Sequence, residues 1–445
     1  MSEKVRRVVL SGWIRTFRAT LAHSKLARDA WRVFSLQAGV QSINLFTTLY
    51  SIRLMGPREL GVAAFALACS NCAVTCSDLG LDIAGIREFA RDRDGVFSTV
   101  MMLRGIASVC CVLLTVGFFA VFRPQGGALL WVAAALQVPV RSLFPRWTYQ
   151  ALEILPTFNL IAFVQSLAAA GLTIVALPNR PHADCYAVIG LVAQIFATAT
   201  AIVVLYAGAG IRLVKPPIRQ TIAMLRRSGR AFAIIIAVSL YAACEIPIIS
   251  VLLSAEEAGY YKAAQSTISG LLPILSTVAT LVYPRLVAWT RLSGTEFALR
   301  LRVLTGTLAV IAVVMATGSW IVLPTLTIAA LGSRFAPAVA PAMLLVAAKG
   351  VVMVSTPCAW GIHALDEDRR LLRIVVGVAM VSLSLNLGLT ARLGILMPAA
   401  VNVVSESLIL TCASYVVARV LRERERKGAA LVSCESRGAV ALDRI

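Results

Sequence analysis

Long apolar tracts, each nearly free of charge and ended by a short polar turn, are the feature that most constrains this chain. Two examples run from Val109 to Phe122 and from Arg373 to Leu389. A helix needs about 20 mainly apolar residues to cross the hydrocarbon core of a bilayer. Of the 445 residues, 59% are hydrophobic and only 14% are charged, whereas about a quarter are charged in a soluble protein. The sequence therefore predicts an all-α, polytopic membrane protein.

The tracts and the breakers between them predict about twelve transmembrane helices. The expected spans are 33–54, 60–80, 100–122, 127–150, 158–177, 184–207, 230–253, 260–285, 302–323, 335–363, 371–391 and 395–418. Prolines interrupt several of these spans. Such breaks are tolerated at membrane depth only where protein or a water-filled cavity satisfies the freed backbone groups, so some spans are expected to line a cavity.

The distribution of basic residues predicts the topology. The formal net charge is +20. If both ends are cytoplasmic, as an even number of spans requires, roughly four fifths of the 42 Lys and Arg residues fall in cytoplasmic segments, which is the positive-inside bias of membrane proteins. Topology and attraction to anionic lipids explain the charge, so no nucleic-acid partner is expected.

A repeated turn indicates that the chain has two related halves. The segment RLMGPRELGVAAFA (Arg53–Ala66) aligns with VLLSAEEAGYYKAA (Val251–Ala264) at an offset of 198 residues, which places Gly61 on Gly259. Because six is an even number of spans, both halves start on the inside and form parallel six-helix lobes. Transporters built this way carry their substrate between the lobes. The two turns are expected to form an outer rim in which the glycines matter more than the charges.

These boundaries predict five segments. They are a basic amphipathic cytoplasmic segment at 1–32, an N-terminal six-helix lobe at 33–211, an interlobe linker at 212–229, a C-terminal six-helix lobe at 230–418 and a cytoplasmic tail at 419–445. The first segment lacks the features of a signal peptide. It is expected to lie on the inner leaflet as an interfacial helix, with a disordered basic tail as the alternative.

Several segments, in order along the chain, resemble bacterial polysaccharide-biosynthesis flippases. These are the Wzx-type O-antigen and exopolysaccharide transporters of the multidrug/oligosaccharidyl-lipid/polysaccharide exporter superfamily. The resemblance covers about residues 33–418 and rests on RLMGPRELGVAAFA, SDLGLDIAGIREFARDRD (Ser77–Asp94), EIPIISVLLSAEEAGYYKAA (Glu245–Ala264), VYPRL (Val282–Leu286), ALGSRFAPA (Ala330–Ala338) and SLNLGLTARLGILMPAAVNVVSESL (Ser384–Leu408).

The resemblance implies a carrier that flips an undecaprenyl-pyrophosphate-linked oligosaccharide from the inner to the outer leaflet of the bacterial plasma (inner) membrane. It implies two helical bundles that form a V and open alternately to each side. The partners it implies are this lipid-linked precursor of cell-surface polysaccharide, such as lipopolysaccharide or exopolysaccharide, the membrane lipids and other polysaccharide assembly proteins.

Cations inside the predicted spans are candidate contacts for such an anionic substrate, because an ionisable residue at membrane depth usually faces protein or water. Lys349 is the deepest of them. It is either a contact for the pyrophosphate or acidic sugars, or one side of an internal ion pair with Glu245 or Glu406. Arg53 and Lys262 lie near outer span ends, where they either line the cavity or extend to the interface.

Three further charged residues are candidates with an alternative role. Glu245 stands two residues before Pro247 in a predicted broken helix, and it is either a site of H⁺ or Na⁺ coupling or a structural partner for a lysine. Asp78, near the inner end of the second span, is expected to satisfy helix-end or interlobe contacts near Arg87 rather than to couple an ion. Arg146 is a candidate to attract the entering diphosphate, although the positive-inside bias explains it equally well.

No cofactor, metal or enzymatic activity is expected. Cys69, Cys72 and Cys76 share one helical face, but no histidine is near them in sequence, and cysteine also behaves as a small apolar residue. The sequence contains no nucleotide-binding loop and no catalytic constellation. A cation-coupled multidrug antiporter of the same superfamily is the alternative function. A membrane-embedded glycan polymerase or ligase is a weaker one, since every predicted outer connection is short.

Overall fold

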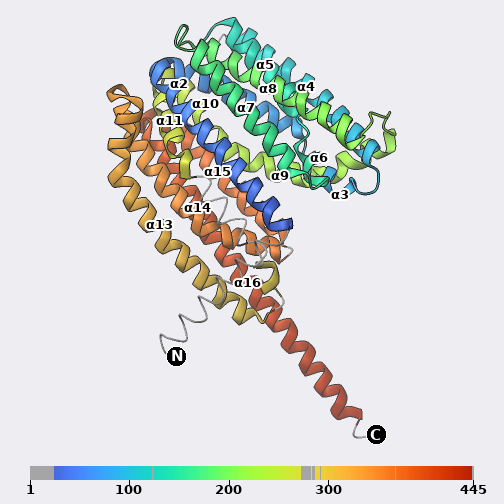
Figure 1. The fold of residues 1–445 in the computed structure, drawn as a ribbon. Coiled ribbons are helices and arrows are strands. Elements are labelled where there is room, and N and C mark those ends of the chain that lie inside the picture. Colours follow the sequence, from blue (N-terminus) through green and yellow to red (C-terminus); the bar gives the residue numbers. More distant parts are fainter. Residues whose placement is uncertain are drawn as a thin grey trace.

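The computed structural model describes residues 25–122, 125–271, 282, 286–290, 292–365 and 367–442. Every regular element in these ranges is a helix (Figure 1). In chain order the elements are α2 (Lys25–Asp78), α3 (Leu81–Glu88), α4 (Arg93–Phe122), α5 (Ala128–Ser142), α6 (Arg146–Ala151), α7 (Leu155–Ala176), α8 (Ala183–Ala209), α9 (Ile218–Ala243), α10 (Glu245–Leu252), α11 (Ala255–Ile268), η1 (Ser269–Leu271), α13 (Gly294–Leu331), η2 (Ser333–Ala338), α14 (Val339–Ala364), α15 (Asp368–Leu393) and α16 (Leu396–Leu442).

The long helices follow the predicted spans. Nine helices in the described ranges are long and apolar enough to cross a membrane. The first of them, α2, contains the first two predicted spans. The two are separated at Gly56, where the backbone leaves the helical conformation (φ 80°, ψ 171°). The seventh span falls on α9 and α10, and the eighth begins in α11 and continues outside the described residues. The chain is therefore an all-α polytopic membrane protein, as the sequence predicted.

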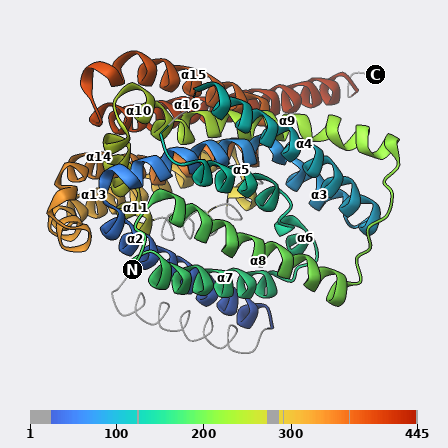
Figure 2. The ribbon, with the colours of Figure 1, turned by 90° about the horizontal axis from the view of Figure 1, so that it is seen from above.

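Two groups of helices are connected by α2 and α9 (Figures 1 and 2). Helices α2, α4, α5, α7 and α8 contact one another, and so do α13, α14, α15 and α16. Helix α9 contacts α2 and α3 on one side and α15 on the other. It begins at Ile218, so most of the predicted linker is helical, and α16 continues to Leu442 through most of the predicted tail. Residues 1–24 of the predicted amphipathic segment lie outside the described ranges.

The two repeated turns meet where α2 crosses α11. A Cβ added at Gly61 would lie 1.6 Å from the carbonyl oxygen of Ala255, and one added at Gly259 would lie 1.8 Å from the carbonyl oxygen of Pro57. The contact is reciprocal, because the offset that relates Gly61 to Gly259 also relates Pro57 to Ala255. Backbone therefore touches backbone at this crossing. In a bilayer the hydrophobic effect does not drive helices together, so their association depends on close packing, which small residues allow.

Side-chain oxygens fix where two of the neighbouring helices begin. The Ser254 hydroxyl accepts a hydrogen bond from the backbone N–H of Glu257 (3.1 Å), as expected for an N-cap residue. This start places Gly259 in the second turn of α11, opposite α2. The carboxylate of Glu59, on α2, accepts a hydrogen bond from the backbone N–H of Ala183 (2.8 Å), the first residue of α8. The repeated turns thus position helices as well as joining them.

Replacing Gly61 by Ala should destabilise the protein by about 2–3 kcal/mol, because a methyl group at this crossing overpacks two backbones that cannot move apart independently. The free energy of unfolding, measured by denaturant titration in mixed micelles, tests this. Gly171 in α7 is the matched control, because a Cβ there meets nothing within 4 Å. Gly171→Ala should stabilise the helix by about 0.5–1 kcal/mol. Equal effects of the two substitutions would contradict the close crossing.

Candidate functional site

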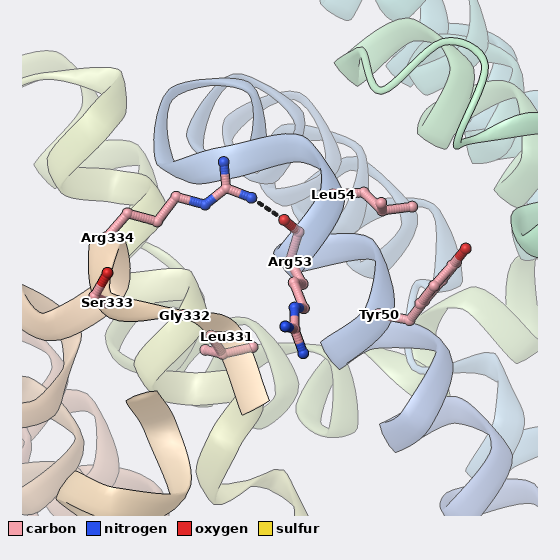
Figure 3. Close-up of a pocket in the computed structure, with 7 residues that line it drawn as sticks. All are labelled: Tyr50, Arg53, Leu54, Leu331, Gly332, Ser333 and Arg334. Carbon is pink, nitrogen blue, oxygen red and sulfur yellow. Dashed lines mark hydrogen bonds between the residues drawn. The ribbon is translucent and has the colours of Figure 1, made fainter. Parts of the chain in front are cut away.

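The proline in the first repeated turn leaves one backbone carbonyl without its helical donor. Pro57 has no N–H, so the carbonyl of Arg53, four residues earlier, cannot be paired within α2. Arg334, in η2, donates a hydrogen bond to this carbonyl through its guanidinium (Figure 3). The guanidinium also covers Gly56, where an added Cβ would lie 3.4 Å from it. The contact supplies a donor that α2 lacks at this position, and it ties η2 to the break in α2.

A pocket of about 540 Å³ lies beside this contact. Its lining residues are Tyr50, Arg53, Leu54, Leu331, Gly332, Ser333 and Arg334. In Figure 3 the Arg53 side chain extends between Leu331 and Tyr50, away from the guanidinium of Arg334. Arg53 is exposed, and within the described ranges no carboxylate lies within 4 Å of its guanidinium. The predicted cavity cation Arg53 is therefore free to contact an anion at this pocket.

Glu245 is the centre of a buried polar network that joins three helices. It begins α10 and is 3% exposed. Its Oε2 accepts hydrogen bonds from Tyr261 Oη (2.8 Å) and Gln265 Nε2 (3.0 Å), which are one turn apart on α11. Its Oε1 accepts a hydrogen bond from Asn402 Nδ2 (2.5 Å) on α16. Three neutral donors thus satisfy this carboxylate, as a buried charge requires.

The structure brings Lys349 near this network without pairing it. Lys349 is half-buried on α14 and close enough to Glu245 to act on it electrostatically. In the part of the chain that the structure describes, no carboxylate lies within 4 Å of the Lys349 or Lys262 ammonium group, so neither lysine forms an ion pair there. Lys262 is half-buried on α11. Glu406 is buried on α16, one turn after Asn402.

A second charged cluster lies within the first group of helices. Arg104, on α4, is 2% exposed, and its Nη2 contacts the carboxylates of both Asp78 and Asp82, the latter at 2.7 Å. The sequence predicted contacts of Asp78 near Arg87. In the structure Arg87 is exposed, and Asp78 contacts Arg104. The reason is the turn between α2 and α3, where Gly80 adopts a left-handed conformation (φ 67°). This turn brings both aspartates against α4.

Arg146 lies at the edge of this second cluster. It is exposed at the start of α6, and its guanidinium lies 5.8 Å from the centroid of the Phe158 ring. It also acts electrostatically on Asp82. Of the predicted site residues, the structure therefore places Lys349 near Glu245, Arg146 near Asp82 in the cluster that contains Asp78, and Arg53 at the separate pocket.

The sequence-based interpretation missed the residues that complete these contacts. Tyr261 and Gln265 flank Lys262, and their four-residue spacing was the signal that one turn of α11 presents two donors. Arg104 stands within the predicted third span, where a charge at membrane depth should have indicated a buried partner. Pro57 predicted an unpaired carbonyl, but nothing in the local sequence pointed to Arg334 as its donor.

Comparison with known proteins gives a family and a fold. The sequence profile of the family described as polysaccharide biosynthesis protein matches residues 26–289. The solved structure of the lipid II flippase MurJ in an inward closed conformation is similar, with a TM-score of 0.70 and 11% identity over 86% of this chain and 87% of the flippase. No curated protein sequence matches the chain.

Two transporters of the MOP superfamily have the same fold. An inward-facing multidrug resistance MATE family transporter gives a TM-score of 0.58 at 14% identity, over 88% of this chain and 95% of that one. A MOP superfamily transporter from Pyrococcus furiosus gives 0.54 at 12% identity, over 91% and 97%. At these identities the likeness establishes the fold alone.

Replacing Arg104 by Met should destabilise the protein by about 3 kcal/mol, because it leaves two partly buried carboxylates without the cation that both contact. Unfolding in mixed micelles measures the change. The combination with Asp78→Asn and Asp82→Asn should recover most of the loss, since the stranded charges are then gone. Arg302 occupies the equivalent position of the repeat but is exposed, so Arg302→Met should change stability by less than about 0.5 kcal/mol. A triple variant no more stable than Arg104→Met would contradict the ion-pair role.

Proposed function

Because the chain belongs to the polysaccharide biosynthesis protein family, we propose that it moves a lipid-linked polysaccharide precursor, an undecaprenyl-pyrophosphate-linked oligosaccharide, from the inner to the outer leaflet by alternating access. The fold is that of transporters, since a flippase and multidrug transporters share it over most of their length. What we propose beyond the family and the fold is the substrate, the direction of transport and the residues that contact the substrate.

The observation that carries the proposal is that Lys349 has no carboxylate within 4 Å of its ammonium group among the described residues. A half-buried ammonium group on a membrane-spanning helix is costly unless an anion or water meets it. Arg104, by contrast, is already neutralised by two aspartates and has no charge left for a ligand. Lys349 is near Glu245, yet that carboxylate is satisfied by three other donors. A diphosphate entering between the helices would supply the direct ion-pair partner that Lys349 lacks among the described residues.

The other proposed substrate contacts share this property. In the described ranges, Arg53, Lys262 and Arg146 also have no carboxylate within 4 Å. We assign Arg53 and Lys262 to the outer half of the path and Arg146 to the inner entrance, where its charge would attract the diphosphate from the cytoplasmic side. Cations that keep their charge available favour an anionic cargo over a cationic drug.

Glu245 is proposed as the site of ion coupling. Its three hydrogen bonds come from neutral side chains on two other helices, α11 and α16, so a change in its charge would alter how these helices are held together. H⁺ or Na⁺ would supply that change. Glu406, one turn from Asn402 on α16, is a second candidate. Asp78 is assigned a structural role, because Arg104 already binds it.

A cation-coupled multidrug antiporter is the second candidate function. The fold shared with MATE transporters and the buried acids Glu245 and Glu406 favour it. A glycan polymerase or ligase has no support beyond the sequence-based alternative. We place the multi-pass protein in the bacterial inner membrane with both termini in the cytoplasm, and we propose that other polysaccharide assembly proteins receive its product.

A deletion strain complemented with variants tests the proposal. Lys349→Ala removes a charge-assisted contact worth about 1.5–3 kcal/mol, so export of surface glycan should fall at least about tenfold, and lipid-linked oligosaccharide should accumulate inside. Glu245→Gln should also reduce export if Glu245 couples an ion. Lys215→Ala is the control, because it removes the same charge from an exposed position between α8 and α9, and it should restore export fully.

Two outcomes would change the conclusion. Full rescue by Lys349→Ala and Glu245→Gln would leave the flippase function in place and remove the proposed site. Normal surface glycan in the deletion strain, together with greater sensitivity to cationic drugs, would favour the antiporter instead.

A further inference from the structure

The first half of α2 carries a stripe of neutral polar side chains that is separate from the proposed substrate-binding cations. Gln37, Gln41, Asn44 and Thr48 recur at intervals of four, three and four residues, which places them on one face of a helix. The first three are exposed and Thr48 is half-buried. On the opposite side of the same helix Phe46 is 71% exposed, as a residue that faces lipid should be.

Part of this stripe lines a pocket of about 300 Å³ between α2 and η1. The lining residues are Ala38, Gln41, Ser42, Asn44, Leu45, Thr48, Ser269 and Gly270. The pocket therefore lies where the first half of the chain meets the second, since η1 directly follows α11. A Cβ added at Gly270 would lie only 3.5 Å from Leu45, so the two walls touch at one edge of the pocket.

Three polar side chains of the stripe have no hydrogen-bond partner among the residues that the structure describes. In the described part of the chain, the side chains of Gln41, Asn44 and Thr48 make no hydrogen bond that meets a 3.5 Å limit. The neighbouring Thr47, on another face, instead donates to the carbonyl of Ile43 (2.7 Å) in its own helix. An amide that faced hydrocarbon without a partner would cost several kcal/mol. This face of α2 must therefore meet water or a polar ligand.

We propose that this stripe binds the sugar hydroxyls of the transported glycan. The inference rests on the proposed function and adds a second contact to it, separate from the cations. Each sugar hydroxyl both donates and accepts a hydrogen bond, and carboxamide and hydroxyl side chains offer both kinds of group. The stripe itself carries no charge, so it suits the neutral part of the cargo, whereas Lys349 suits the diphosphate. Its position between the two groups of helices gives it access to a cargo that passes there.

Binding of two lipids to the full-length protein in lipid nanodiscs tests the inference. One probe is undecaprenyl pyrophosphate without a glycan. The other is the glycan-bearing lipid extracted from the strain in which the gene is deleted. The double variant Gln41→Leu with Thr48→Val should bind the glycan-bearing lipid at least tenfold more weakly than wild type, and bare undecaprenyl pyrophosphate within twofold of wild type. Lys349→Ala should weaken binding of both lipids.

Thr47→Val and Thr48→Val form a matched pair one residue apart. Both remove one hydroxyl without changing size, so the pair remains informative even if the double variant does not fold. Thr48→Val should weaken binding of the glycan-bearing lipid about threefold or more, and Thr47→Val should leave it unchanged. Thr48→Ser keeps the hydroxyl and should bind as wild type does.

Three outcomes would overturn the inference. Unchanged binding of the glycan-bearing lipid by Thr48→Val and the double variant would remove the stripe from the substrate path and leave the flippase function standing. An equal loss for both lipids would show that the stripe does not recognise sugar. Failure of wild type to bind either lipid would overturn the proposed function and this inference with it.

Discussion

Helices α2 and α11 approach until backbone touches backbone, and the pocket at Arg53 and the network around Glu245 both lie beside that crossing. Gly61 meets Ala255 and Gly259 meets Pro57, so the two halves of the chain contact each other through equivalent residues. In a bilayer, helices are held together by van der Waals packing and polar contacts rather than by exclusion from water. A crossing without side chains brings the most atoms into contact. It therefore holds the two halves close at one end while α9 bridges them elsewhere.

The crossing also explains two polar contacts that would otherwise look unrelated. Pro57 sets the bend of α2 but strands the carbonyl of Arg53, and Arg334 from the other half supplies the donor. On the far side of the same crossing, α11 presents Tyr261 and Gln265 to Glu245. The first contact satisfies a backbone carbonyl that the break in α2 leaves unpaired, and the second satisfies the buried side-chain carboxylate of Glu245. Movement of one half against the other would have to break the contact between Arg334 and Arg53, whereas Glu245 and its three donors all belong to the second half and could move together.

The spans could be predicted from the sequence because lipid is a uniform environment, in which length and apolarity decide whether a helix crosses it. The repeat, in turn, predicted two related turns. Neither source of information sets which face of one helix meets which neighbour. Asp78 was therefore expected to make helix-end or interlobe contacts near Arg87, whereas the turn at Gly80 directs it to Arg104 on α4. The donors around Glu245 were missed for the same reason, since α16 approaches only in the folded chain. Whether Lys349 and Glu245 act in transport stays a prediction.

The membrane-embedded charged groups divide into those that have direct partners within the described part of the protein and those that do not. Two aspartates contact Arg104, and three neutral donors bind Glu245. These residues hold helices together and need no contact with the cargo. Lys349, Lys262 and Arg53 keep a charge that no described carboxylate neutralises at close range. They are accompanied by the neutral stripe on α2, whose side chains Gln41, Asn44 and Thr48 have no hydrogen-bond partner among the described residues. A cargo with a diphosphate at one end and hydroxyl-rich sugars at the other would satisfy both sets at once, whereas a small cationic drug would satisfy neither.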